Sequence, residues 1–214
     1  MKEKYSPKNI ALFVISNLVS CFASCMCLKA NIGSGAYSAL SKTAAPLLNI
    51  KIGYVQIIMN SICVLTEFIC LKKKFGIRHI LQFPMITITG IITNFFYYDV
   101  LGDLVINNYV LRVLALVVGD FVNAAAVAML LNLDIVTTAL GGACHVVSQT
   151  LKTNYAIIRQ SVDIICIVGV LICHFIFKGE LSIREGTIIS MIEFGHFVDF
   201  WLARTKKIIN KKED

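Results

Sequence analysis

Two acidic side chains interrupt long apolar stretches of the sequence, and an isolated acid in such a place can bind a proton or a cation. Asp120 stands inside LALVVGDFVNAAAVA, with Asn123 one helical turn later. Glu193 stands inside SMIEFGHFVDFW, with His196 three residues further on. An ionisable residue at the centre of a membrane helix costs about 2.5 to 3.5 kcal/mol, so it usually turns inward and is often functional. We expect these four residues either to relay a proton or cation, or to fix helix packing through hydrogen bonds.

A second polar group combines opposite charges. Arg159 and Asp163 are four residues apart and share one face of a helix, so an ion pair within that helix is the favoured interpretation. In the first half of the chain, Gln56 and Asn60 occupy the matching positions. We therefore add these four side chains to the candidate polar groups inside the membrane.

The elements that must position these residues are apolar helices. The 214-residue chain is 57% hydrophobic and 15% charged, with a mean hydropathy of +0.76, which excludes a soluble domain of ordinary composition. Windows of roughly 20 apolar residues, enough to cross about 30 Å of hydrocarbon, occur at 9–28, 53–71, 79–98, 109–131, 155–177 and 185–203. We predict an all-α, polytopic protein with about six transmembrane helices. Glu67 lies near the end of the second window and is expected at the membrane interface.

The basic residues predict the orientation. Cytoplasmic segments carry an excess of Lys and Arg, and a cytoplasmic N-terminus places most of the 20 basic residues on that side: Lys2, Lys4, Lys8, Lys72, Lys73, Lys74, Arg78, Lys152, Arg159, Arg204, Lys206, Lys207, Lys211 and Lys212. We predict a multi-pass protein of the cell membrane, inner or plasma, with both termini cytoplasmic. The net charge of +7 then reflects orientation in the lipid bilayer, and no nucleic-acid partner is expected.

The two halves match weakly but in order, at an offset of about 100 to 106 residues. Ser38-Ala39-Leu40 falls on Thr138-Ala139-Leu140, and Cys63 falls on Cys166. Residues 1–104 and 105–214 are therefore predicted to be two three-helix repeats within a single membrane domain. Because three is odd, the second repeat enters the membrane in the opposite sense, which makes a 3+3 inverted repeat of the kind found in secondary transporters.

A polar, small-residue segment follows the first helix of each predicted repeat, at 31–50 and 132–153. One interpretation is a re-entrant segment whose exposed helix amino end binds a polar ligand, with Asp134 capping the second segment. The other is a surface loop with a short helix, and the sequence leaves both open. The candidate ligand-binding residues are Gly33, Gly35, Ser38, Asp134, Thr137, Thr138, Gly141 and Gly142.

Other classes of chemistry find no support in the sequence. The four histidines lack metal-binding spacing such as HExxH, and the eight cysteines lie mostly in apolar runs, where thiols act as small hydrophobic groups. Gly141-Gly142 is not part of a phosphate-binding loop, and no nucleophile motif assembles. We expect no enzyme, no metal and no cofactor.

Several stretches resemble the YczE/YyaS/YitT group of bacterial membrane proteins. They are NIGSGAYSALSK, IKIGYVQIIMNSICVL and KKKFGIRHILQFPMITITGIITNFF in the first half, and LDIVTTALGG, RQSVDIICIVGVLI and IREGTIISMIEFGHFVDFW in the second. The resemblance covers nearly the whole chain. It implies an inner-membrane, transporter-like protein, and it supplies neither a substrate nor catalytic residues.

These observations favour a small secondary transporter or permease for an unidentified small solute, with a polar site where the repeats meet. Two alternatives stay open: a substrate-binding membrane subunit of an ATP-driven importer, and a membrane scaffold or regulatory protein without a ligand. So little hydrophilic mass is also compatible with a homodimer. The substrate, the direction of transport and the coupling ion cannot be read from the sequence.

Overall fold

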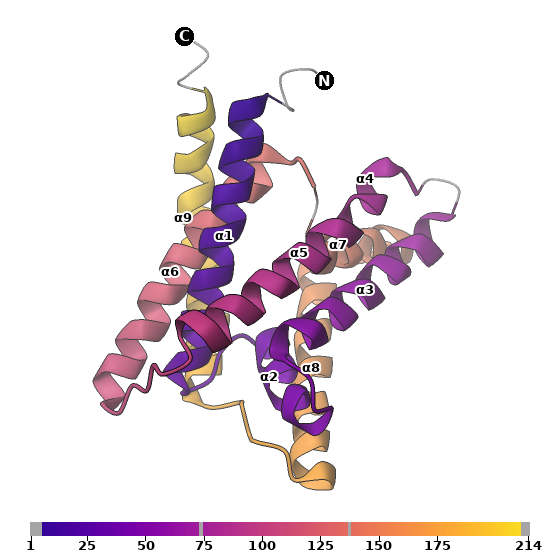
Figure 1. The fold of residues 1–214 in the computed structure, drawn as a ribbon. Helices are drawn as coiled ribbons and strands as arrows, with labels where there is room; N and C mark the ends of the chain where they lie inside the picture. Colours follow the sequence, from indigo (N-terminus) through magenta and orange to yellow (C-terminus); the bar gives the residue numbers. More distant parts are fainter. Residues whose placement is uncertain (1–5, 73–74, 137, 211–214) are drawn as a thin grey trace. The chain divides into compact units, whose positions relative to one another are not determined.

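The computed structural model describes residues 6–72, 75–136 and 138–210 (Figure 1). Within these ranges all regular structure is helical, which confirms the all-α prediction. The elements are α1 (Pro7–Ala30), α2 (Ala36–Leu47), α3 (Ile52–Leu71), α4 (Ile77–Ile80), α5 (Gln82–Asn94), the π-helix η3 (Phe95–Val100), α6 (Tyr109–Leu133), α7 (Ala139–Leu151), α8 (Tyr155–Phe177) and α9 (Glu185–Asn210).

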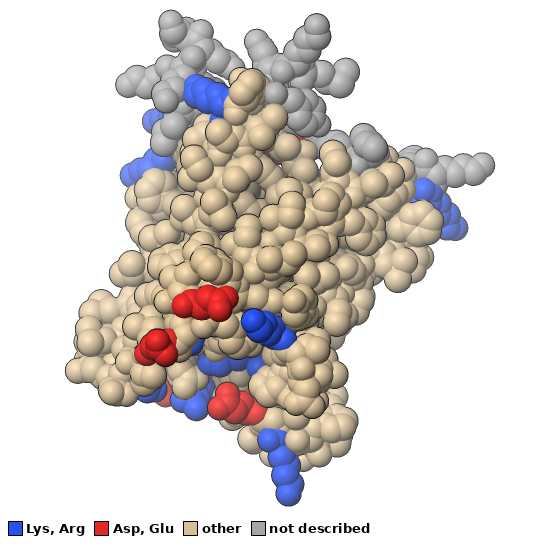
Figure 2. All heavy atoms as spheres, in the orientation of Figure 1, with Lys and Arg blue, Asp and Glu red and all other residues tan. Residues whose placement is uncertain are grey.

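Four of the six predicted windows correspond to helices long and apolar enough to cross a membrane. These are Pro7–Ala30, Ile52–Leu71, Tyr109–Leu133 and Ile157–Phe177. Large apolar side chains are exposed along them, and Figure 2 shows uncharged atoms over most of the visible surface. Contact between so much apolar surface and water would be unfavourable, so the protein has the character of a membrane protein.

The third and sixth windows differ from the other four. Window 79–98 is divided among the short α4, the 13-residue α5 and η3. Window 185–203 lies in α9, where three acidic residues interrupt the apolar sequence. Six transmembrane helices therefore stay a prediction.

Local sequence signals set the boundaries of α6. The Asn108 side chain accepts a hydrogen bond from the backbone N–H of Val110 at 2.9 Å and so caps the amino end. Asp134 ends the helix in the left-handed conformation, with φ of 45°. The expectation that Asp134 caps the following segment is wrong, because aspartate tolerates this conformation and here terminates α6. The next helix, α7, begins at Ala139 after Thr138.

The chain forms two compact units, which we describe separately. Unit 1 contains the described parts of 1–35, 95–135 and 183–214, and unit 2 contains those of 36–94 and 136–182. Both units draw on both halves of the chain, so neither corresponds to one predicted repeat. The 3+3 repeat concerns internal symmetry and stays a prediction.

Unit 1 consists of α1, η3, α6 and α9, and α6 packs against both α1 and α9. A small apolar core holds α1 to α6 through Cys27, Ala30, Ile32 and Leu116. Gly119 permits this approach, because a Cβ there would overlap the Cys27 sulfur. The backbone N–H of Gly186, at the start of α9, donates to the carbonyl of Ile32 at 2.8 Å.

Unit 2 is built around the two long helices α3 and α8. The short helix α2 packs mainly on α8, and the short helix α7 packs mainly on α3, while α5 covers another part of α3. Val64, Ile86 and Ala139 form a core where α3, α5 and α7 meet. Glycines bring α3 and α5 into backbone contact, since a Cβ at Gly53 would overlap the carbonyl oxygen of Gly90. The polar segments 31–50 and 132–153 thus contain packed helices.

Candidate functional site

A group of polar side chains lies within unit 2 where α2, α3, α7 and α8 pack together. We call Tyr37, Asn60, Cys63, Cys144, Arg159 and Asp163 the polar cluster of unit 2. The Tyr37 hydroxyl donates to Asn60 Oδ1 at 3.1 Å and lies 3.9 Å from the Cys63 sulfur. This contact joins the first polar segment to the apolar helix that follows it.

Arg159 supplies the positive charge of the cluster. Its Nη1 donates to Asp163 Oδ1 at 2.6 Å, which confirms the ion pair expected within α8. The Arg159 side chain is 35% exposed and that of Asp163 is 15% exposed, so solvent screens the pair only in part. Asp163 fixes one edge of a planar guanidinium that has five N–H donors.

The field of Arg159 reaches the two short helices. Burial raises the pKa of the Tyr37 phenol on α2, the Cys63 thiol adds to the effect, and the Arg159 guanidinium opposes it. Burial likewise raises the pKa of the Cys144 thiol on α7, and Arg159 again opposes the shift. One guanidinium therefore acts on groups from both polar segments, and the arrangement suits an uncharged or negatively charged polar ligand.

Asn60, Arg159 and Asp163 were among the residues predicted from the sequence, whereas Tyr37, Cys63 and Cys144 were not. Tyr37 and Cys144 stand in the predicted polar segments, and Cys63 stands on α3. The available signal was the spacing of Asn60 and Cys63, which are three residues apart and therefore present one face of α3 to whatever packs there.

A second polar centre lies in unit 1 around Asp120, which is 6% exposed. The Ser190 hydroxyl of α9 donates to Asp120 Oδ2 at 2.5 Å, and the Cys27 thiol of α1 donates to Oδ1 at 3.4 Å. Each of the three helices contributes one group, and both carboxylate oxygens are engaged. This geometry favours the packing interpretation of Asp120.

The other predicted polar residues of unit 1 surround this centre. Asn123 Oδ1 accepts a hydrogen bond from the Ser20 hydroxyl at 2.7 Å, one turn along α6. Glu193 Oε1 is buried without a hydrogen-bond partner in the described ranges. His196 is exposed, and among the described residues no ion pair joins it to Glu193.

The predicted ligand-binding residues are divided between the units. In unit 1, Gly33 has φ of 107°, and a Cβ there would meet the backbone N of Thr187 at 2.7 Å, so packing already explains the glycine. Within the described residues, no atom lies within 4 Å of a Cβ position on Gly35, and Asp134 is exposed at the end of α6.

In unit 2, Ser38 is half-buried on α2, and Gln56 is half-buried on α3. Thr138 is exposed before the first turn of α7, with its hydroxyl 2.6 Å from where a Cβ on Gly141 would stand. Thr137 lies outside the described residues. Gly142 is buried, and a Cβ there would overlap Glu67 Oε1.

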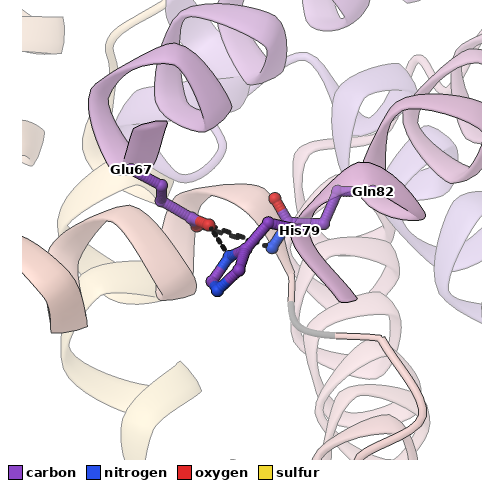
Figure 3. A network of polar contacts seen from close by, with 3 residues as sticks. All are labelled: Glu67, His79 and Gln82. Carbon is purple, nitrogen blue, oxygen red and sulfur yellow. Dashed lines mark hydrogen bonds and ion pairs between the residues drawn. The ribbon is translucent and has the colours of Figure 1, made fainter. Parts of the chain in front are cut away.

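Glu67, which was expected at the membrane interface, is buried among the helices of unit 2. It is fully buried, with 0% exposure. His79 Nδ1 of α4 lies 2.5 Å from Glu67 Oε2, and Gln82 Nε2 of α5 donates to the same oxygen at 3.2 Å (Figure 3). These partners come from helices further along the chain and bury the carboxylate within the protein. The expected position of Glu67 at the membrane interface stays a prediction.

Comparisons with known proteins identify the family. The chain belongs to DUF6198, a family of unknown function, whose model matches residues 7–203. No curated protein and no solved structure matches the chain. Function must therefore be argued from the polar groups themselves.

Proposed function

We propose that this member of the DUF6198 family is a small secondary transporter of the cell membrane, and that the polar cluster of unit 2 binds its solute. The observation that carries the proposal is Arg159, a guanidinium that is hydrogen-bonded to Asp163 and whose electrostatic field reaches Tyr37 of the Tyr37–Asn60 pair. A charge of this kind is expensive among apolar helices and is usually retained for a ligand or a pathway.

The donors of Arg159 indicate the chemistry of the solute. In the described ranges, the only hydrogen bond of the guanidinium runs from Nη1 to Asp163. The remaining N–H groups suit a planar acceptor such as a carboxylate, which arginine binds with two parallel hydrogen bonds. We therefore propose a small solute with an acceptor group. The centre at Asp120 is a weaker candidate because the protein's own donors occupy both of its oxygens.

The packing of the short helices supports the proposed inverted repeat. In the predicted alignment of the halves, α2 corresponds to α7 and α3 corresponds to α8. The contact of α2 with α8 then has its counterpart in the contact of α7 with α3. The last helices depart from this correspondence, since α5 packs on α3 whereas α9 packs on α6. Within the proposal, α2 and α7 are re-entrant helices that reach the solute site from opposite sides.

The remaining features of the proposal come from the sequence. They are six transmembrane helices, cytoplasmic termini, and a kinship with the YczE/YyaS/YitT group. Exposed apolar side chains along the four long helices support residence in a bilayer.

Water accessibility of the two short helices tests the proposal. Single cysteines at Ser38→Cys and Thr138→Cys, in a protein lacking its eight cysteines, are treated in oriented vesicles with a membrane-impermeant maleimide applied from each side. We expect Ser38→Cys to react from outside and Thr138→Cys from inside. A panel of amino acids, carboxylates and sugars is then screened for protection, and a protecting compound is tested for uptake into proteoliposomes with and without Arg159→Lys.

Each outcome separates the candidate functions. Protection at both positions, with uptake that fails in Arg159→Lys, supports the transporter. Labelling of both positions from one side contradicts the inverted topology. No labelling at either position indicates a packed bundle and favours a scaffold, while uptake that requires a co-purified ATPase favours the importer subunit.

A further inference from the structure

The contacts of Glu67 place a buried carboxylate beside a histidine that solvent reaches. Glu67 is 0% exposed, whereas the His79 side chain is 22% exposed. A buried carboxylate is tolerated when it is paired and hydrogen-bonded, and removal of its partner is costly. The partner here is an imidazole, the side chain whose charge changes most readily near neutral pH.

We propose that Glu67 and His79 form a proton-binding site, which is loaded from water through the imidazole and is sensed by α7 at Gly142. The inference of a proton site depends only on contacts within unit 2. The role of α7 as a sensor rests on the proposed transport function, in which the proton is the coupling ion.

The proton reaches Glu67 through the two ring nitrogens of His79. The ring nitrogen that does not face Glu67 takes a proton from water, and the cationic ring then passes its Nδ1 proton to Glu67 Oε2, 2.5 Å away. The ring ends neutral with its proton on Nε2, and the carboxyl group has gained one proton. Release runs through the same steps in reverse.

An unpartnered atom beside the pair fits the protonated form. Gln82 is 1% exposed, and its Oε1 has no hydrogen-bond partner in the described ranges, while its Nε2 donates to Glu67. An ionised Glu67 can only accept hydrogen bonds, but a protonated one has an O–H donor. A proton on Glu67 therefore supplies the donor that Gln82 Oε1 lacks, through a rotation of the amide.

Other titratable groups near Glu67 lie one helical turn away. Cys63 precedes it on α3. Its thiol interacts electrostatically with Glu67, Cys144 of α7 and Arg159 of α8, and it also contacts the Tyr37 hydroxyl of α2. Helix α5, which supplies Gln82, contains no titratable side chain. His79 is thus the only titratable group that hydrogen-bonds to Glu67 among the described residues.

Gly142 links the pair to the second polar segment. A Cβ at Gly142 would overlap Glu67 Oε1 and stand 3.5 Å from Gln82 Nε2, so the backbone of α7 lies directly on the network. Protonation changes both the charge and the hydrogen-bond direction at this contact. We expect the first turn of α7, which begins after Thr138, to respond to it.

Infrared difference spectroscopy tests the proton site without any assay of transport. Spectra of the full-length protein in liposomes are recorded at a series of pH values, and the carbonyl stretch of a protonated carboxyl group is followed. We expect a pH-dependent band that is lost in Glu67→Gln. The midpoint of this band moves in His79→Gln and stays in place in His145→Gln, which alters an exposed histidine of α7 in the same unit. If Glu67→Gln does not fold, the comparison of the two histidine variants decides the question.

The response of α7 is measured separately by the labelling rate of Thr138→Cys in the cysteine-free protein. We expect its pH profile to change when Glu67→Gln is added, and an unchanged profile overturns the role of α7. An infrared spectrum of Glu67→Gln that retains the wild-type band overturns the proton site and leaves the proposed transporter standing. A topology that contradicts the transporter leaves the infrared result unaffected, so the two proposals fail independently.

Discussion

Removal of the Ser190 hydroxyl tests whether the Asp120 centre holds the helices of unit 1 together. Ser190 of α9 donates to Asp120 Oδ2 of α6 at 2.5 Å, and Asp120 is 6% exposed. The other carboxylate oxygen receives only a thiol donor, Cys27, at 3.4 Å. Ser190→Ala therefore deletes the stronger of two hydrogen bonds to a buried acid.

The expected cost follows from the nature of this bond. Hydrogen bonds between membrane helices contribute about 0.6 kcal/mol on average, because partners also exist in the unfolded state in the membrane. Bonds to charged groups contribute about 1.5 to 3 kcal/mol, and an acceptor left unsatisfied in an apolar place adds to the loss. Since the bond is short and its acceptor is buried, we expect Ser190→Ala to lower the free energy of unfolding by about 1.5 to 3 kcal/mol.

Unfolding in mixed micelles with increasing SDS measures this cost. The single tryptophan, Trp201, lies on α9 with its ring centroid 5.3 Å from that of Phe121 on α6, so its fluorescence reports on the contact between these helices. A double-mutant cycle with Asp120→Ala, which removes the acceptor, isolates the pairwise contribution.

The control is Ser161→Ala, since Ser161 is exposed and its hydroxyl donates to Ile157 of its own helix at 2.9 Å. Its effect is expected to stay within about 0.5 kcal/mol. The Ser190–Asp120 hydrogen bond does not stabilise unit 1 if Ser190→Ala costs no more than this control, or if its effect is unchanged in the Asp120→Ala background.

Three further predictions use the same unfolding assay or a simple labelling assay. Gly90→Ala is expected to destabilise by about 1 to 3 kcal/mol through overpacking against α3. Gly195→Ala is expected to be neutral or stabilising, because no atom of the described part of the chain lies within 4 Å of its Cβ position; equal effects would contradict the close approach of α3 and α5. Asp163→Asn is expected to cost about 1 kcal/mol or less, because Arg159 is 35% exposed and solvent screens the pair; a loss as large as that of a fully buried pair would refute the partial exposure. Burial raises the pKa of the Cys144 thiol, so with the other cysteines removed, N-ethylmaleimide is expected to react slowly at pH 7, faster as pH rises and faster after unfolding in SDS, and rapid reaction of the folded protein at pH 7 would show that this thiol is accessible.

Features that depend on local spacing could be predicted from the sequence. Four apolar windows became long helices, because a run of about 20 apolar residues has few other stable forms in a membrane. The Arg159–Asp163 pair formed because residues four apart are neighbours on any helix. The two polar segments contain the short helices α2 and α7, whose packing in unit 2 could not be derived from composition.

Features that depend on contacts between helices could not be predicted. Asp134 lies between two predicted helices and could end the first or cap the second. Its sequence position does not decide between the two, because the outcome depends on where the chain runs after α6. Glu67 and His79 are 12 residues apart and lie on the separate helices α3 and α4, so their spacing alone does not predict that they meet. In the sequence, Cys27 is indistinguishable from an ordinary apolar residue. Its thiol reaches Asp120 only because Gly119 of α6 lets α1 approach closely.

The partners of three acidic residues indicate which of them can respond to pH. Asp163 pairs with a guanidinium, which keeps its charge at every physiological pH. The positive charge that this pair offers to a solute therefore does not depend on pH. Asp120 is held by a hydroxyl and a thiol from two other helices, and any change in its charge would weaken the packing of unit 1. Of these three acids, only Glu67 is paired with an imidazole, the type of side chain whose charge changes most readily near neutral pH, and it also lies against the backbone of α7. If a proton drives this protein, the contact between Glu67 and Gly142 is therefore where its binding can be converted into movement of a helix.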